Sequence, residues 1–205
     1  MIVIIDYGMG NLGSIQNMLK KIGVQAEISS KRHDIESADK LILPGVGAFD
    51  AGLKNLDERG LIPVLQNQVI KNKTPILGIC LGMQLMTKSS EEGDRPGLGW
   101  IDATTVRFKF GKEEQNLKIP HMGWNTVNLK KQITLFRDMF EEPRFYFVHS
   151  YHVICNNEEN ILATTNYGDD FVSAFQKGNI IGVQFHPEKS HKFGMKILKN
   201  FVDFF

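Results

Sequence analysis

Short apolar runs alternate with amphipathic segments over residues 1–88, and this alternation constrains the fold more than any other feature. The runs cover 1–6, 25–29, 40–43 and 76–79. Between the first two, apolar residues recur every three or four positions from Leu12 to Ile22, which predicts a helix over 11–22 that ends at Gly23. Further helices are predicted over 49–72, with an interruption near Gly60 and Pro63, and over 83–88. Such alternation is typical of a parallel sheet covered by helices on both faces.

The pattern changes after Gly97, where strands predominate. Strands are predicted over 100–110, 125–129, 144–149, 161–166, 171–176 and 180–186, with a hairpin turn at 177–179 and an amphipathic helix over 190–205. No Pro- or Ser-rich linker divides the chain. We therefore predict one α/β domain over 1–205, with a mostly parallel central sheet flanked by helices and an additional antiparallel sheet.

Composition excludes several classes of function. Lys and Arg total 24 against 23 for Asp and Glu, a net charge of +1, so we expect no nucleic-acid binding. The N-terminal apolar run is far shorter than the roughly 20 residues of a membrane span, and no basic segment precedes it, so neither a membrane anchor nor a secretory signal is expected. The two cysteines form no CxxC motif. These features predict a cytoplasmic protein in which a functional cysteine acts as a thiolate.

Cys80 lies in a motif that is typical of a functional cysteine. The segment Gly78-Ile79-Cys80-Leu81-Gly82 has the G-x-nucleophile-x-G pattern between a predicted strand and a predicted helix. The glycines permit a sharp turn, the start of a helix favours a thiolate, and the Leu81 N–H would point toward an oxyanion. Because most free cysteines are simply buried, the pentapeptide alone leaves catalysis and packing equally open.

A histidine and a carboxylate near the C-terminus complete a possible triad. His186 and Glu188 flank Pro187 directly after an apolar strand. Residues two apart in an extended segment project to the same side, so Glu188 can orient the His186 ring, which can then take a proton from Cys80. Both segments end parallel strands, where open α/β sheets place their sites, and this combination favours catalysis.

Other motifs have the spacing of ligand sites. The segment 8–13 is a literal G-x-G-x-x-G with Glu27 downstream, but two residues separate the strand from its first glycine, which disfavours dinucleotide binding. His149 and His152 have a metal-like spacing, but a continuous strand would place them on opposite faces, so no metal is expected. The loop 44–49 has two glycines and is either a plain turn or a second oxyanion donor. Composition alone favours core positions for Trp124 and Tyr146.

Taken together, these motifs resemble the class I glutamine amidotransferases, and among them the glutaminase subunits of imidazole glycerol phosphate synthase. The resemblance extends over nearly the whole chain through the segments 6–11 (DYGMGN), 44–47 (PGVG), 78–84 (GICLGMQ), 120–125 (PHMGWN), 147–151 (FVHSY) and 185–190 (FHPEKS). It implies a triad of Cys80, His186 and Glu188, glutamine contacts from Gln84, Ser150 and Tyr151, an oxyanion hole from Val46, Gly47 and Leu81, and a partner-facing group of Asn11, Trp124, Tyr146 and Lys189. It implies no cofactor.

The resemblance also implies a partner, because such glutaminases deliver ammonia to a second active site for which this chain has no room. We expect a heterodimer with a (β/α)8-barrel cyclase. The segment 136–155 also resembles paralogues from bacterial surface-polysaccharide pathways, which deliver ammonia to a sugar-modifying synthetase, so the acceptor stays open. An esterase or peptidase with the same elbow and a non-catalytic binding module are the rival classes.

Overall fold

The centre of the molecule is a ten-stranded sheet, half parallel and half antiparallel. The computed structural model describes residues 1–111, 116–130 and 133–205. Five parallel strands lie in the order β2 (Ala26–Ser29), β1 (Ile2–Ile5), β3 (Lys40–Leu43), β4 (Ile76–Ile79) and β12 (Ile180–Val183). This half confirms the parallel sheet that the alternating sequence predicts.

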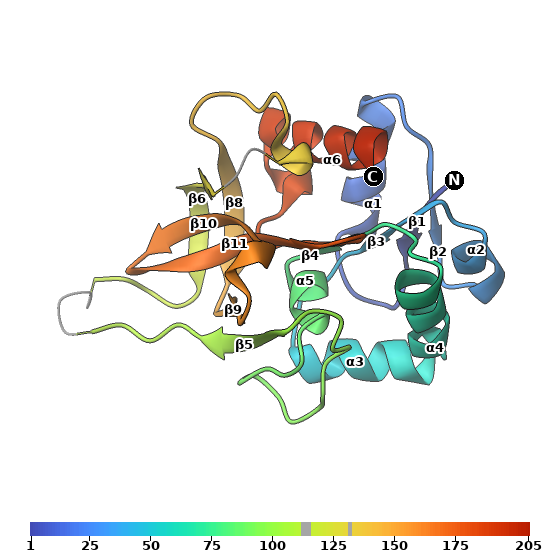
Figure 1. Ribbon diagram of the computed structural model, residues 1–205, viewed down its shortest axis with the longest axis horizontal. Coiled ribbons are helices and arrows are strands. Elements are labelled where there is room, and N and C mark those ends of the chain that lie inside the picture. Colours follow the sequence, from blue (N-terminus) through green and yellow to red (C-terminus); the bar gives the residue numbers. More distant parts are fainter. Residues whose placement is uncertain (112–115, 131–132) are drawn as a thin grey trace.

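The antiparallel half continues from β12. It contains β11 (Asp169–Lys177), β10 (Ile161–Tyr167) and β7 (Asn128–Leu129), while β9 (Tyr151–Cys155) joins β11 to β5 (Ala103–Arg107). A separate two-stranded antiparallel sheet pairs β6 (His121–Thr126) with β8 (Arg144–His149). These strands extend to one side of the molecule, away from the N-terminal strands (Figure 1). The additional antiparallel sheet is therefore also confirmed.

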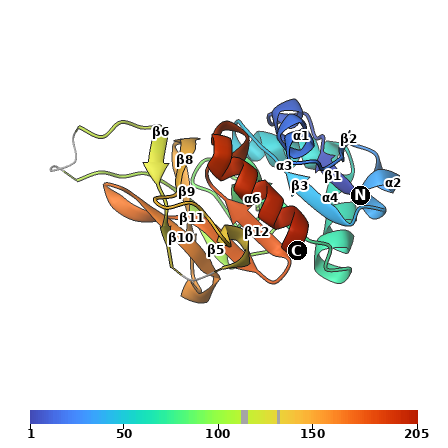
Figure 2. The same ribbon diagram turned by 90° about the horizontal axis from the view of Figure 1, so that it is seen from above.

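Helices cover both faces of the parallel half. On one face lie α1 (Leu12–Lys21) and α6 (His191–Phe204); on the other lie α2 (Arg32–Glu36), α3 (Phe49–Glu58), α4 (Leu61–Gln66), the π-helical segment η1 (Asn67–Lys71) and α5 (Leu81–Leu85). Figure 2 shows α6 lying across the sheet. Alternate residues of β1 enter the two cores, with Ile4 packing toward α1 and α6 and Val3 toward the other helices. This two-sided burial explains why the strand has no polar position.

Several predicted boundaries differ from the structure. The strand predicted over 100–110 is confined to 103–107, and the segment predicted as the strand 125–129 is divided between β6 and β7. β9 was not predicted, because Ser150 separates it from β8. That break also overturns the expectation that His149 and His152 face opposite ways: both rings contact Phe108, with centroid distances of 5.3 and 4.7 Å. The two-residue hairpin between β11 and β12 is as predicted.

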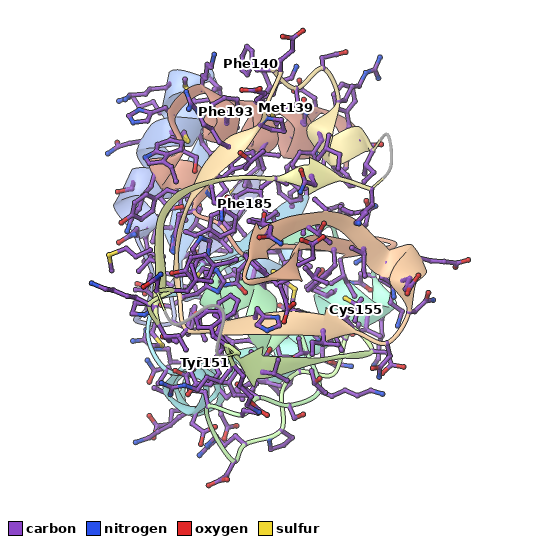
Figure 3. The ribbon with its side chains drawn as sticks, turned by 90° about the vertical axis from the view of Figure 1, so that its left-hand side faces the viewer. Met139, Phe140, Tyr151, Cys155, Phe185 and Phe193 are labelled. Atoms are coloured by element: carbon purple, nitrogen blue, oxygen red, sulfur yellow. The ribbon has the colours of Figure 1, made fainter. Side chains whose placement is uncertain are left out.

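Among the described residues, no helix has the length and apolar character that crossing a membrane requires. Short 3₁₀ turns occur at η3 (Thr134–Phe136), η4 (Glu158–Asn160) and η5 (Pro187–Lys189). Aromatic packing fixes the segment that leads into η5: Phe185 is fully buried and stacks on Phe145, with ring centroids 3.9 Å apart. Phe193 at the start of α6 packs against Phe140 near the molecular surface (Figure 3).

Candidate active site

The register between β4 and β12 brings the predicted nucleophile and the predicted histidine segment together. These neighbouring parallel strands pair Ile79 with Val183, and the Cys80 N–H donates to the Val183 carbonyl at 2.8 Å. Cys80 and Gln184 therefore leave the sheet side by side, and His186 follows two residues later. Residues more than a hundred positions apart thus meet at the carboxyl edge of the sheet, the position predicted from the sequence.

Cys80 occupies a strained turn between β4 and α5. Its φ of 52° and ψ of −109° are outside the regions that a residue with a side chain usually adopts. Gly82 makes the turn possible, because a Cβ built there would lie 1.8 Å from the Leu43 carbonyl oxygen. The strand–turn–helix context of the elbow is confirmed. α5 is only five residues long, however, so fewer peptide dipoles act on the sulfur than a full helix would provide.

His186 and Glu188 form a buried pair behind Cys80. The Nδ1 atom of His186 lies 2.8 Å from Oε1 of Glu188, and the side chains are 1% and 2% exposed. Asn11 donates its side-chain amide to the same carboxylate oxygen at 3.2 Å. The His186 backbone is held by its N–H bond to the Tyr146 carbonyl and by the Ser190 hydroxyl, which donates to its carbonyl. The ring is therefore fixed, and its buried Nε2 has no hydrogen-bond partner among the described residues, which leaves that atom for proton exchange.

Charges within this group stabilise one another. Burial acts to lower the pKa of His186, but the adjacent Cys80 sulfur and the Glu188 carboxylate outweigh it and raise the pKa to about 10. Burial acts to raise the pKa of Glu188, but hydrogen bonds from His186 and Asn11 and the imidazolium charge hold it below its ordinary value. The His186 ring thus lies between the Cys80 sulfur and the Glu188 carboxylate, which is the order of groups that activates a cysteine nucleophile.

A cavity of about 360 Å³ opens in front of Cys80. Its lining includes every residue predicted to bind glutamine and every residue predicted to form the oxyanion hole, namely Val46, Gly47, Leu81, Gln84, Ser150 and Tyr151. It also includes Glu92, which was not predicted because nothing in the acidic pair 91–92 separates it from a solvated turn. Burial raises the pKa of Glu92, while the Phe49 N–H donates to its carboxylate. The cavity therefore combines a nucleophile with one partly buried carboxylate.

One of the predicted oxyanion donors, the Leu81 N–H, already has a hydrogen-bond acceptor. The Leu81 N–H donates to the Gly45 carbonyl at 3.4 Å, so a carbonyl of the 44–47 loop occupies the amide that an oxyanion would need. Tyr7 holds this loop by donating its hydroxyl to the Pro44 carbonyl at 2.6 Å, and its own pKa is raised by burial and by the Cys80 charge. The loop is thus held with a carbonyl at the position predicted for the oxyanion hole.

The four predicted partner-facing residues lie around the His186–Glu188 pair. The rings of Trp124 and Tyr146 make an edge contact with centroids 6.4 Å apart, and Lys189 Nζ lies 5.4 Å from the Tyr146 ring centroid. Trp124 is 45% exposed, so its composition-based assignment to the core is wrong. Asn11 is half-buried and contacts this group through Glu188. These side chains provide a direct connection between the surface and the predicted triad.

The remaining candidate ligand sites have structural explanations. In the G-x-G-x-x-G segment, Gly10 has a φ of 101°, and a Cβ there would lie 2.9 Å from Pro44. The absence of a side chain at Gly10 therefore permits this close contact with the 44–47 loop. Within the described ranges, no group of three or more His, Cys, Asp or Glu side chains has the geometry of a metal site. Cys155 is a free, buried thiol at the end of β9 opposite Tyr151 (Figure 3), and burial raises its pKa to about 11.

The fold and this site define a class I glutamine amidotransferase. Residues 3–204 match the model of the family described as glutamine amidotransferase class-I, and the chain belongs to that family. The solved structure of a glutamine amidotransferase from Thermotoga maritima has the same fold, with a TM-score of 0.67 at 18% identity and with 98% of this chain and 82% of that chain covered. A second solved glutamine amidotransferase gives a TM-score of 0.72 at 20% identity, with 99% of this chain and 98% of that chain covered.

Within this family, the chain belongs with the HisH subunits. It is 58% identical to imidazole glycerol phosphate synthase subunit HisH 2 of Methanococcus maripaludis, with 98% of each chain covered. It is 51% identical to the protein of the same name from Pseudomonas aeruginosa, with 99% of each chain covered. The HisH 1 subunit of Campylobacter jejuni strain RM1221 is 47% identical, with 98% of this chain and 99% of that protein covered.

Proposed function

We propose that this chain is the glutaminase subunit of an imidazole glycerol phosphate synthase and hydrolyses L-glutamine through Cys80, His186 and Glu188. The Cys80 sulfur attacks the side-chain amide carbon, and His186 donates its proton to the departing ammonia. Water, deprotonated by His186, then cleaves the thioester and releases glutamate. The observation that carries the proposal is the β4–β12 register, which supports placing the sulfur and the buried His186–Glu188 pair at one cavity.

Polar groups around the cavity match the other end of glutamine. Glu92 offers a carboxylate for the substrate ammonium, and Ser150 and Tyr151 offer polar groups from the β8–β9 junction. The Gln84 amide nitrogen is engaged by the Tyr151 carbonyl and by Gln184, which leaves its oxygen for the substrate. This distribution favours a free amino acid as the substrate. In a peptide, the continuing chain would lie against the Glu92 carboxylate in place of an ammonium group.

The partner controls the reaction through the oxyanion hole. Because the Gly45 carbonyl accepts the hydrogen bond from the Leu81 N–H, an oxyanion that forms there would face a hydrogen-bond acceptor instead of a donor. The Gly45 carbonyl and the Val46 N–H belong to one peptide group and point in opposite directions. Turning that peptide over would free Leu81 and bring the Val46 N–H into the hole, with Gly47 allowing the change. We infer a low glutaminase rate for the isolated chain and strong stimulation by the partner.

The ammonia is used by that partner, a cyclase with a (β/α)8-barrel fold, which makes imidazole glycerol phosphate and AICAR in histidine biosynthesis. Ammonia released into neutral water becomes protonated and is no longer a nucleophile, so it must be transferred directly. We propose that Asn11, Trp124, Tyr146 and Lys189 face the partner and that residues 1–205 form one glutaminase domain in the heterodimer. The names of the HisH relatives support this acceptor.

The test combines covalent labelling with partner-dependent rates. A glutamine-like chloroketone should alkylate Cys80 and abolish glutamate release, whereas the Cys80→Ser variant should resist both labelling and turnover. Cys155→Ser is the matched control, because that buried thiol lies outside the cavity, and it should retain labelling and activity. The rates of glutamate release with and without the cyclase test whether the partner regulates the oxyanion hole, and equal rates would contradict that regulation. Turnover of peptides, or partner capture that recovers a sugar-modifying synthetase, would contradict the assignment.

A further inference from the structure

Gln184 is a fully buried polar side chain that neither the triad nor the cavity lining includes. It follows Val183 at the end of β12, directly beside Cys80 at the end of β4. Its backbone N–H donates to the Ser173 carbonyl at 2.9 Å, which fixes its position. Its side-chain Nε2 lies 3.7 Å from Cys80 Sγ, within hydrogen-bond range for sulfur. The proposed nucleophile therefore has a second polar neighbour besides His186, the buried amide of Gln184.

The orientation of this amide follows from a chain of hydrogen bonds that begins at a backbone carbonyl. The Tyr151 carbonyl can only accept, so the Gln84 atom that lies 2.9 Å from it must be Nε2. The same Nε2 lies 3.1 Å from the Gln184 side chain, which must therefore present its oxygen to Gln84. Gln184 is then left with its N–H groups on the side of Cys80. Rotating this amide by 180° would oppose two donors at Gln84 and place an oxygen against the sulfur.

The Tyr151 carbonyl is itself held in place. Nδ1 of His149 lies 2.7 Å from it, and Nε2 of His149 lies 3.2 Å from Nδ1 of His121. Burial lowers the pKa of both histidines, that of His121 to about 4. Because both rings are neutral, each donates one hydrogen bond and accepts one, which is the pattern these contacts require. The carbonyl that orients Gln84 and Gln184 is thus fixed from the opposite side.

We propose that Gln184 is a second hydrogen-bond donor to the nucleophile, which stabilises the Cys80 thiolate through the contact between Nε2 and Sγ. The inference rests on the proposed function only in taking Cys80 as the nucleophile. α5 is short and contributes little through its dipole, and the Tyr7 hydroxyl is committed to the Pro44 carbonyl. Gln184 therefore supplies neutral, permanently oriented donation that stays in place when His186 gives up its proton.

The test compares pH profiles for alkylation of Cys80 by iodoacetamide. The Gln184→Met variant keeps the size of the side chain and removes the donor. The matched control is Gln68→Met, because Gln68 is also buried and hydrogen-bonded, to Thr74 and Asn72, at the opposite end of β4. His186→Asn reports on the triad in the same assay. Both glutamine variants leave the ionisable groups around the sulfur unchanged. These are His186 with Glu188 behind it, Tyr7, and the cavity-lining Glu92, His149 and Tyr151.

Loss of one hydrogen bond to a charged group should raise the midpoint of the Gln184→Met profile by about one pH unit and slow alkylation roughly tenfold at pH values below the wild-type midpoint. Gln68→Met should keep the wild-type midpoint. An unmoved midpoint in Gln184→Met overturns the proposal, whatever the His186 variant does. An unmoved midpoint in His186→Asn would instead count against the triad, so the two failures are distinguishable.

A measurement on the unaltered protein covers the case in which Gln184→Met does not fold. The side-chain amide protons of Gln184, observed by ¹⁵N–¹H correlation spectroscopy, should shift with the midpoint of Cys80 alkylation and shift again when the sulfur is alkylated. The amide of Gln68 provides the internal reference and should not respond. A Gln184 amide that is equally unresponsive would overturn the proposal.

Discussion

Replacing Glu188 with glutamine tests how the buried carboxylate acts on His186. The two donors on Glu188 Oε1, from His186 and from Asn11, lie at 2.8 and 3.2 Å. In E188Q the amide oxygen can take this position, because the reverse orientation would place an NH₂ group against both donors. Asn11 therefore holds the glutamine so that His186 keeps its tautomer, and only the negative charge is lost.

The expected loss of kcat in E188Q is limited, because only the charge of residue 188 is removed. A hydrogen bond to a charged group contributes about 1.5–3 kcal/mol, so kcat of E188Q should fall roughly 10- to 150-fold. E188L removes the acceptor as well as the charge, and its kcat should fall on the order of 10⁴-fold, as expected when the orienting acid of a triad is lost. The assay is glutamate release at saturating glutamine and saturating cyclase, with folding checked by circular dichroism.

The Asn11→Ala background provides the control. Without the Asn11 amide, the glutamine of E188Q can turn its NH₂ group toward His186, so the loss caused by E188Q should be larger in N11A than in the wild-type background. Equal losses in the two backgrounds would show that Asn11 does not orient residue 188. Equal kcat values for E188Q and E188L would refute the argument that orientation and charge are separable here.

Three further outcomes are expected. Because folding lowers the pKa of His121 from 6.5 to about 4, the unfolded chain binds a proton that the folded chain does not, and stability falls as pH decreases through that window. His121→Asn should therefore reduce the slope of the urea-derived unfolding free energy against pH by about 1.4 kcal/mol per pH unit, and an unchanged slope would contradict this. Trp124→Ala should change unfolding free energy by less than about 1 kcal/mol but reduce stimulation by the cyclase, and unaltered stimulation would argue against this interface. Gly82→Ala places a Cβ 1.8 Å from the Leu43 carbonyl oxygen and should destabilise by about 3 kcal/mol or more, whereas Gly13→Ala meets nothing within 4 Å and should not lower the thermal midpoint.

Most of the parallel half of the fold was predictable because β1, β3, β4 and β12 are almost wholly buried and therefore carry continuous apolar runs. β6 was predicted only in part because its pattern is inverted: His121 is buried, whereas Met122 is 62% exposed. A period-two pattern of apolar residues cannot identify a strand whose buried side chain is a histidine. The strand predicted over 144–149 matches β8, but β9 was missed, because residue types alone do not show that a second strand begins directly after Ser150.

The predicted nucleophile and histidine could be found because each stands in a local motif whose geometry does not depend on the rest of the chain. Glu92 and Gln184 have no such motif, and their importance depends on where the loop and β12 bring them. The Gly45 carbonyl could not be predicted from residue types, because a glycine-rich loop can direct either a carbonyl or an N–H at the same point. Backbone orientation of this kind requires coordinates.

The position of β12 has a consequence for synthesis of the chain. This strand lies between β4 and β11, yet it is synthesised after both of them. A nascent chain that has displayed the cysteine elbow still lacks the imidazole, the carboxylate and the central strand that carries them. By the mechanism proposed above, it cannot consume glutamine before its sheet is closed. The long sequence separation of these contacts delays folding, but it also makes the enzyme inert until folding is complete.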